Sequence, residues 1–263
     1  MLRNLHLPDK LRASLLKSGI TGEISAHGST TNITAINRML KNDPYVTFGI
    51  DVVKDAVVAK QFTQGQMIEV MADALGTPSA RFRKDGPGYI DPQLTASRLS
   101  EMIDQVTTAA RKHSVFLVAT AHPGSLTSYY FKLIDYIISN GGRVYRAPHL
   151  VKVADYRWID QIGGVHILSD QGGLLHTHDA IGFSKFLAQL DTLPDIVLAD
   201  HGYAGAAMNA HIRTIAIHDV DDPGIPLAAH LGEDVLTIPM NDNQLNMPTA
   251  SALQAILDSR LAP

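Results

Sequence analysis

The chain has 263 residues, of which 45% are hydrophobic and 18% are charged, and its formal net charge is −4. This composition excludes a disordered chain, and the negative charge argues against a nucleic-acid partner. Because the sequence has no cysteine, disulfides, a thiolate nucleophile and a cysteine-bound zinc are excluded as well. No apolar run approaches the roughly 18 residues of a membrane span and the N-terminus lacks a signal-peptide pattern, so we expect a cytoplasmic protein without membrane contact.

The first 112 residues are predicted to form a helical part. Apolar residues recur at helical spacing over residues 9–18, 33–40, 63–75 and 94–111. The third of these stretches begins with a capping box formed by Thr63 and Gln66 and ends at Gly76. The connection over residues 81–92 is basic, so it either reaches over an anionic ligand or is simply solvated.

Residues 115–119, VFLVA, predict a buried strand that is followed by a loop and a helix over residues 126–139. The loop carries Thr120, His122, Gly124 and Ser125, and it leaves room for an anion at the helix N-terminus. We therefore predict that these four residues bind phosphate. The loop is neither a P-loop nor a dinucleotide fingerprint, because it lacks the lysine and the repeated glycines of those motifs. Residues 143–147 predict the returning strand.

Residues 148–162 predict a long connection around Trp158 that could form a lid. Residues 164–168 and 174–177 flank a glycine-rich turn and predict a β-hairpin. Alternation along the second arm places His176 and His178 on one face, next to Asp179, where they could bind a metal or a phosphate. The alternative is that both histidines only cap the next helix.

Residues 196–217 predict a βαβ unit with strands at 196–199 and 213–217 and a helix at 203–210. Asp200 and His201 follow the first strand directly and precede the helix. Open α/β sheets bind ligands at this position, so these two residues are the first candidates for chemistry. An aspartate there can also be only a helix cap.

Acidic residues follow the next strand as well. Asp219, Asp221 and Asp222 come after residue 217, and such oxygen ligands suit a divalent cation, with Mg²⁺ the expected ion. An Asp-Asp-Pro turn without any metal is the alternative. Residues 235–238 predict a last strand that ends near Asp242 and Asn243, and residues 249–261 predict a closing helix.

Together these elements predict one α/β domain over residues 1–263, with a helical N-terminal part (1–112) and a sheet-bearing core (113–263) that holds the site. The expected fold is a mainly parallel, Rossmann-like sheet with helices on both faces. Imidazole or carboxylate groups follow the predicted strand ends at His122, His176, Asp200, His218 and Asp242. Because the ends of parallel strands share one edge, we expect these groups to converge in one crevice.

Four motifs resemble those of a family of actinobacterial proteins named as phosphatases. They are ATAHPGSL (119–126), GGVHILSDQGGLLHTH (163–178), ADHGYAGAA (199–207) and IPMNDN (238–243). The resemblance runs from residue 42 to the C-terminal helix. It implies hydrolysis of a phosphomonoester, with a small phosphorylated metabolite as the partner, and it identifies no substrate.

Two known phosphatase mechanisms do not fit the residues. Gly172 stands where haloacid-dehalogenase phosphatases need a second aspartate, and the Arg-His-Gly signature of phosphohistidine enzymes is missing near the N-terminus. We therefore predict attack by metal-activated water. In this prediction Asp200, Asp219 and His178 hold the cation, and His201 or His176 handles the proton together with Asp200.

Two other functions stay open. The loop and helix after residue 119 are also similar to sugar-phosphate isomerases of the ribose-isomerase type, which use carboxylate bases without a metal. A non-catalytic protein would bind a sugar phosphate without turnover. Chelator sensitivity separates the hydrolase from the isomerase, and the sequence is compatible with a homo-oligomer.

Overall fold

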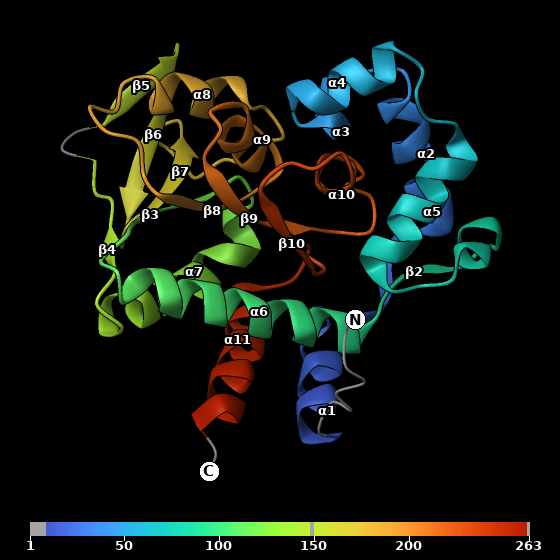
Figure 1. Cartoon of the computed structure of the whole chain (residues 1–263), viewed down its shortest axis with the longest axis horizontal. Coiled ribbons are helices and arrows are strands. Elements are labelled where there is room, and N and C mark those ends of the chain that lie inside the picture. The colour runs from blue at the N-terminus through green and yellow to red at the C-terminus, as the bar shows by residue number, and fades with distance from the viewer. Residues whose placement is uncertain (1–8, 148–149, 262–263) are drawn as a thin grey trace.

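The centre of the molecule is a sheet of mainly parallel strands (Figure 1). The computed structural model describes residues 9–147 and 150–261. The sheet has the order β10-β9-β8-β3-β7-β6-β5, and β4 pairs with the start of β3. Its strands are β3 (Val115–Thr120), β4 (Arg143–Val144), β5 (Val151–Ala154), β6 (Arg157–Ile162), β7 (Val165–Ser169), β8 (Ile196–Asp200), β9 (Arg213–His218) and β10 (Val235–Pro239). The predicted mainly parallel sheet is confirmed. The strand predicted over residues 143–147 does pair parallel to β3, but it spans only Arg143–Val144.

The order of these parallel strands reverses beside β3. Numbered along the chain, they have the spatial order 2-1-3-4-5, because β7 lies on one side of β3 and β8 lies on the other. Doubly wound sheets bind ligands outside the carboxyl ends of the strands at such a reversal. The ends of β3 and β8, which carry Thr120 and Asp200, therefore lie where a ligand is expected.

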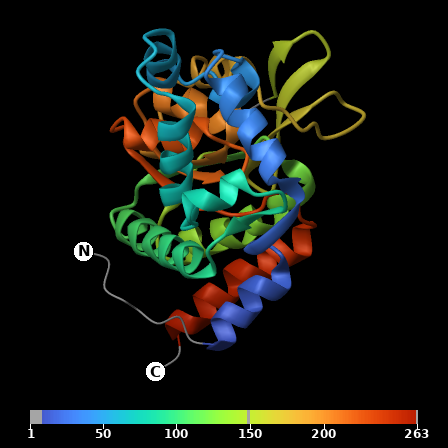
Figure 2. The same ribbon diagram turned by 90° about the vertical axis from the view of Figure 1, so that its right-hand side faces the viewer.

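Helices cover both faces of the sheet (Figure 2). One face carries α1 (Asp9–Ser18), α6 (Pro92–Ala110), α7 (Pro123–Ser139) and α11 (Asn246–Leu261), and the other carries α8 (Ile181–Leu187), α9 (His201–Asn209) and α10 (Gly224–His230). Side chains of β3 alternate between the two cores: Phe116 and Val118 belong to the first, and Leu117 and Ala119 belong to the second. Because both faces are buried, a continuous apolar run forms this strand.

The N-terminal part is mostly helical, as predicted, but it also contains a small sheet. Its further helices are α2 (Ser29–Met39), α3 (Pro44–Thr47), α4 (Asp51–Val58), α5 (Gln64–Leu75) and the 3₁₀ helix η1 (Ser79–Arg83). The capping box of Thr63 and Gln66 is confirmed at the start of α5, and Gly76 ends that helix with a left-handed φ of 65°. The antiparallel strands β1 (Gly22–Gly28) and β2 (Pro87–Ile90) were not predicted. Their alternation is too short to recognise, and each strand depends on a partner far away in the sequence.

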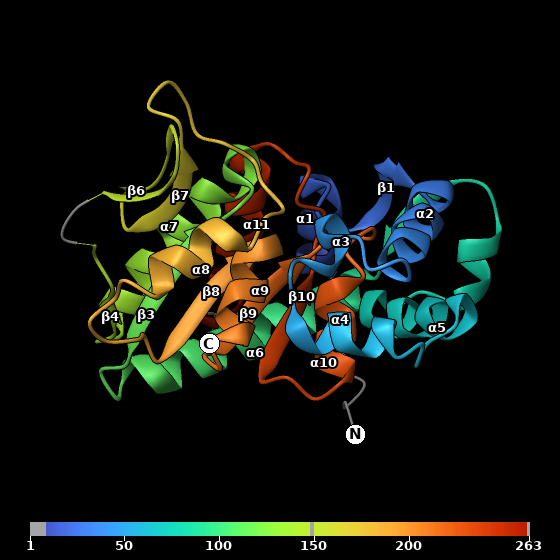
Figure 3. The same cartoon turned by 90° about the horizontal axis from the view of Figure 1, so that it is seen from above.

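Two glycines let the N-terminal part pack directly on α9 (His201–Asn209) and α10 (Gly224–His230). A Cβ at Gly205 of α9 would lie 2.1 Å from the carbonyl oxygen of Phe48, and a Cβ at Gly224 of α10 would lie 2.6 Å from that of Val46. Figure 3 shows α3 and α4 beside α9 and α10. The segment after α3 is thereby held over the carboxyl end of the sheet.

Two predictions for residues 148–177 were wrong. Apart from Pro148 and His149, which lie outside the described residues, the expected lid forms the antiparallel strands β5 and β6 at the edge of the sheet. The expected hairpin has no second arm, since residues 174–177 contribute only one bridge, between Ser169 and Leu174. The side chain of Asp170 instead accepts hydrogen bonds from the backbone of Gly172 and Gly173 and turns the chain towards the end of β3.

No helix in the part of the chain that the structure describes combines the length and the apolar character needed to cross a membrane. The longest of them, α6, has 19 residues and carries charged and polar side chains along its exposed side.

Candidate active site

His201 lies at the centre of the candidate site, directly after β8. Its side chain is 3% exposed, and its backbone has a left-handed φ of 45°. This conformation costs about 1–2 kcal/mol for a residue other than glycine, and such strain is concentrated at functional sites. The following Gly202 is required locally, because a Cβ there would lie 2.4 Å from the carbonyl oxygen of His178.

Asp200 lies beside the His201 ring and does not cap α9. It is completely buried, and its Oδ1 lies 3.2 Å from Nδ1 of His201. Oδ1 also accepts a hydrogen bond from the backbone N–H of Ala121 at 2.9 Å, and Oδ2 accepts one from Oγ1 of Thr120 at 2.7 Å. Among the described residues, Asp200 belongs to no group with the spacing of metal ligands. The geometry favours an orienting role over the metal-ligand role that we predicted.

Two further carboxylates face the other nitrogen of His201. Its Nε2 lies 3.5 Å from Oδ2 of Asp222 and 3.4 Å from Oδ2 of Asp242. All three residues are buried, and Oδ2 of Asp242 has no hydrogen-bond partner in the described part of the chain. The cluster thus contains more buried carboxylates than one imidazolium can balance.

The pKa values in this cluster follow from burial and mutual charge. Burial alone would lower the pKa of His201, but the charges of Asp222 and Asp242 raise it well above its ordinary value. Burial would raise the pKa of Asp222, but the His201 charge lowers it below its ordinary value. Burial raises the pKa of Asp242 well above its ordinary value. His201 and Asp222 therefore form an ion pair, and Asp242 is the carboxylate that is left to take up a proton or a cation.

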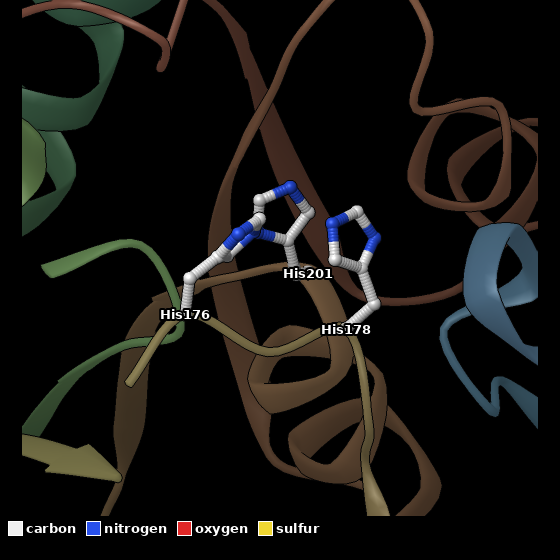
Figure 4. Close-up of side chains that lie close together, drawn as sticks. All are labelled: His176, His178 and His201. Carbon is white, nitrogen blue, oxygen red and sulfur yellow. The ribbon is translucent and has the colours of Figure 1, made fainter. Parts of the chain in front are cut away.

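Three more histidines gather around His201. The ring of His178 stacks on that of His201 at a centroid distance of 4.3 Å, and the ring of His176 contacts that of His122 at 4.3 Å. Figure 4 shows His176 and His178, which come from one loop, on either side of His201. The two side chains converge as predicted, although the loop is not a strand. They do not cap α8, because Asp179 accepts the hydrogen bond from its first N–H.

These surrounding histidines are neutral near pH 7. Burial, followed by repulsion from His201, lowers the pKa of His122 to about 4 and that of His178 to about 3. The same two causes lower the pKa of His176, whose side chain is more exposed. Neutral imidazoles can each donate one hydrogen bond and accept another or bind a metal ion.

The predicted phosphate loop lies next to these rings. Oγ1 of Thr120 already makes hydrogen bonds within the protein: it donates one to Asp200 and accepts one from the backbone N–H of His122. Oγ of Ser125 lies 2.7 Å from Nδ1 of His122. Gly124 is exposed, and a Cβ there would meet no atom within 4 Å. Of the four predicted residues, His122 and Gly124 thus face open space most directly, whereas Thr120 and Ser125 hold other groups.

A second acidic cluster lies at the end of β9. Asp219 is 1% exposed, and its Oδ1 accepts a hydrogen bond from the N–H of Val220 at 2.6 Å. Burial and the neighbouring carboxylates raise the pKa of Asp219 well above its ordinary value and that of Asp221 to about 6. Nδ1 of His27 lies 3.3 Å from Oδ2 of Asp221. His218 is buried beside them, and burial lowers its pKa to about 4.

Among the residues that the structure describes, three groups of side chains could hold a metal ion. In each group the ligand atoms lie within 4.8 Å of one another, and the groups are His176, His178 and His201; His201, Asp222 and Asp242; and His27, Asp219 and Asp221. Each group contains at least one imidazole. Imidazole suits Zn²⁺ and other transition metals, whereas Mg²⁺ prefers oxygen ligands. The donor sets therefore favour a transition metal over the Mg²⁺ that we expected.

A cleft of about 1060 Å³ adjoins the histidines on the side of the N-terminal part. Its lining includes Asn42, Tyr45, Lys54, His176, His178, Ile181 and Lys185. Tyr45 stacks on His178 at a centroid distance of 3.7 Å and so connects the cleft with the metal-ligand side chains. Another cleft, of about 750 Å³, lies among α6, α7 and α11 and has no histidine in its lining.

Residues 7–251 match the model of a family described as "Phosphatase". The chain belongs to this phosphatase family. The match confirms the resemblance that the motifs indicated, and it covers both the N-terminal part and the sheet.

A curated relative carries the same description. The chain is 26% identical over 239 residues to the protein named "Phosphatase SCO2771" of Streptomyces coelicolor (strain ATCC BAA-471 / A3(2) / M145). The aligned region covers 89% of this chain and 88% of the relative. Membership of the family makes a phosphate-ester hydrolase the best-supported class of activity.

Sequence reasoning missed part of the site. Asp222 was named only as one of three neighbouring aspartates, and Asp242 only as a residue at a strand end. The pattern gave no means of ranking them, because their role depends on their distance from His201. His27 was missed altogether. It lies in a short polar stretch, and its partner Asp221 is almost 200 positions away.

Proposed function

We propose that this protein hydrolyses a small phosphomonoester with water activated by a divalent transition metal. The observation that carries the proposal is the buried cluster of His201, Asp222 and Asp242, in which Oδ2 of Asp242 has no hydrogen-bond partner among the described residues. The cluster lies at the carboxyl edge of the mainly parallel sheet, where the strand order reverses, and such positions bind ligands in doubly wound sheets. Membership of the phosphatase family supports the type of reaction.

The proposed metal ligands are Nε2 of His201, which would release its proton when the ion binds, and carboxylate oxygens of Asp222 and Asp242. Asp200 contacts Nδ1 of the same ring, which is the usual place for a carboxylate that orients a metal-binding histidine. When bound, the ion would polarise a phosphoryl oxygen and lower the pKa of water. His178 stacks on His201 and could supply a further ligand.

The surrounding histidines are suited to proton transfer and to phosphate binding. His176 is neutral and exposed, so it can accept the proton that the attacking water loses. His122 is neutral and partly exposed, so it can donate a hydrogen bond to a phosphoryl oxygen. Ser125 orients His122 through its hydroxyl group. Bound phosphate would be adjacent to Gly124 at the start of α7, where the helix dipole favours an anion.

The cleft beside His178 is proposed to hold the rest of the substrate. Tyr45 and Ile181 offer apolar surface there, and Asn42, Lys54 and Lys185 offer polar groups around it. Its volume of about 1060 Å³ is at the upper end of the range for small-molecule sites. The partner is therefore a small phosphorylated metabolite with both apolar and polar parts.

The test measures phosphate release from a panel of sugar, nucleotide and amino-alcohol phosphates. We expect turnover of at least one of them, loss of turnover in EDTA, and recovery on adding Mn²⁺ or Zn²⁺. Asp222→Asn should lower kcat at least ~100-fold, the scale on which a positioned charged group acts. The matched control is Asp155→Asn, since the Asp155 side chain is 92% exposed and should leave kcat unchanged.

Three results would contradict the proposal in different ways. Phosphate release that persists in EDTA would exclude metal-activated water from the reaction. Binding of a sugar phosphate without turnover would indicate a non-catalytic binding protein. Normal kcat in Asp222→Asn would remove the cluster around His201 from the reaction.

A further inference from the structure

A second group of metal-ligand side chains lies where the N-terminal part meets the sheet. It consists of His27 on β1 and of Asp219 and Asp221 after β9, and their ligand atoms lie within 4.8 Å of one another. It shares no residue with the cluster of His201, Asp222 and Asp242. Its residues come from two parts of the chain that only the fold brings together.

Asp219 supplies a buried oxygen that lacks a partner. The residue is 1% exposed, and its Oδ1 accepts a hydrogen bond from Val220, whereas its Oδ2 has no hydrogen-bond partner within the described residues. A buried carboxylate oxygen without a partner is costly unless a proton or a cation compensates it. Asp221 lies beside it, with its Oδ2 3.3 Å from Nδ1 of His27.

The local structure directs His27 towards these carboxylates. The pairing of β1 with β2 shifts register between Ile24 and Gly28, so His27 lies in a stretch of β1 outside the regular pairing. On β2, a Cβ at Gly88 would lie 2.6 Å from the carbonyl oxygen of His27 and 3.0 Å from Cγ2 of Val220. Glycine at position 88 therefore allows the small sheet to approach the loop after β9 closely.

Asn243 fixes the other nitrogen of the His27 ring. Its Nδ2 lies 2.6 Å from Nε2 of His27. The two ends of an amide side chain can exchange places, so Oδ1 of Asn243 can instead accept a hydrogen bond from Nε2–H. Nδ1 of His27, which lies 3.3 Å from Asp221, would then be free of its proton and able to bind a cation.

We propose that His27, Asp219 and Asp221 form a second divalent-cation site, which ties the β1–β2 sheet to the loop after β9. One imidazole and two carboxylates suit Mn²⁺ or Zn²⁺. The ion compensates the free oxygen of Asp219 and reduces its repulsion with Asp221. This site can be tested without the phosphatase reaction. Ion binding there changes the number of ions bound per chain and the order of the N-terminal part, even when no substrate is turned over.

The first test is equilibrium dialysis of the full chain against Mn²⁺ and, in parallel, Zn²⁺, followed by metal analysis. His27→Ala and Asp221→Asn should each bind one ion fewer per chain than the wild type. The two variants remove different ligands, and Asp221→Asn preserves the shape of the side chain. The matched control is His230→Gln, because His230 is exposed on α10 and belongs to none of the ligand groups among the described residues. It should bind as many ions as the wild type.

The second test locates the effect by hydrogen exchange. Mn²⁺ should slow amide exchange in β1 and β2 of the wild type and of the control, and it should leave exchange there unchanged in His27→Ala. If the wild type bound no ion, or if both variants bound as many ions as the wild type, the proposal would be wrong. A chain that binds both ions but releases no phosphate would overturn only the proposed function.

Discussion

Replacing Gly205 with alanine tests how the N-terminal part is held over the site. Gly205 lies in the middle of α9, and its added Cβ would be placed 2.1 Å from the carbonyl oxygen of Phe48. The obstacle is a backbone atom, so no flexible side chain can turn away. Either α9 or the segment around Phe48 has to move. Because the Phe48 ring lies 5.2 Å from that of His201, this movement would reach the site.

The expected magnitude is the difference between two effects. Overpacking a well-packed core costs typically 1–3 kcal/mol, and contact with a fixed backbone atom belongs at the upper end of that range, about 3 kcal/mol. Alanine in place of glycine in a helix contributes about 1 kcal/mol in the opposite direction. We therefore expect Gly205→Ala to lower the free energy of unfolding by about 2 kcal/mol. For a chain of this size the loss corresponds to a Tm lower by about 4–8 °C.

The assay is urea unfolding, combined with thermal melting and with kcat on a substrate from the panel. Gly65→Ala on α5 is the matched control, because a Cβ at Gly65 would meet no atom within 4 Å. The control should be as stable as the wild type or more stable, by up to about 1 kcal/mol. If Gly205→Ala were as stable as this control and had unchanged kcat, the close contact between α9 and Phe48 would not exist.

Three further predictions concern the site and the core. Asp200→Asn keeps the shape of the side chain that contacts Thr120 and Ala121 but removes the charge beside His201. We therefore expect kcat to fall at least ~100-fold with little change in Tm. A normal kcat would exclude an orienting role for Asp200. Tyr45→Ala removes the ring that stacks on His178, a contact worth about 0.5–1.5 kcal/mol, so kcat/KM should fall about 2- to 10-fold. Steady-state kinetics with an unchanged kcat/KM would show that the substrate does not bind in this cleft. Burial lowers the pKa of His166 to about 4 from 6.5, so below pH 6.5 the unfolded chain binds a proton that the folded chain excludes, and stability is lost as the pH falls towards 4. Between pH 6.5 and 5, the free energy of unfolding measured in urea should fall by about 2 kcal/mol more in the wild type than in His166→Gln. An equal fall in both proteins would contradict the assignment.

Local patterns were sufficient to predict most of the sheet. The apolar runs at 115–119, 196–199 and 213–217 became β3, β8 and β9, because strands buried on both faces need apolar side chains on both faces. The capping box at Thr63 likewise fixed the start of α5. The edge strand β5 was hidden because it is short and carries the exposed Lys152 between Val151 and Val153, and an edge strand keeps one side in water.

The composition of the site was predictable only in outline. Asp200 and His201 follow a buried strand, and the sequence by itself determined that they would lie at the carboxyl edge of the sheet. It did not determine which oxygen of Asp200 would contact Thr120. It also did not show that His201 would adopt a left-handed backbone, because that conformation depends on the loop packed against Gly202.

Chemistry in this protein is decided by distances between segments that are far apart in the chain. Asp219, Asp221, Asp222 and Asp242 are the same kind of residue in the sequence, yet only Asp222 and Asp242 lie beside His201. His27 reaches Asp221 only because β1 pairs with β2 and is held against the loop after β9. Hydrophobic spacing is a local property and determines strands and helices. Protonation and metal binding depend on burial and on charge across a few ångströms, which the tertiary structure alone decides.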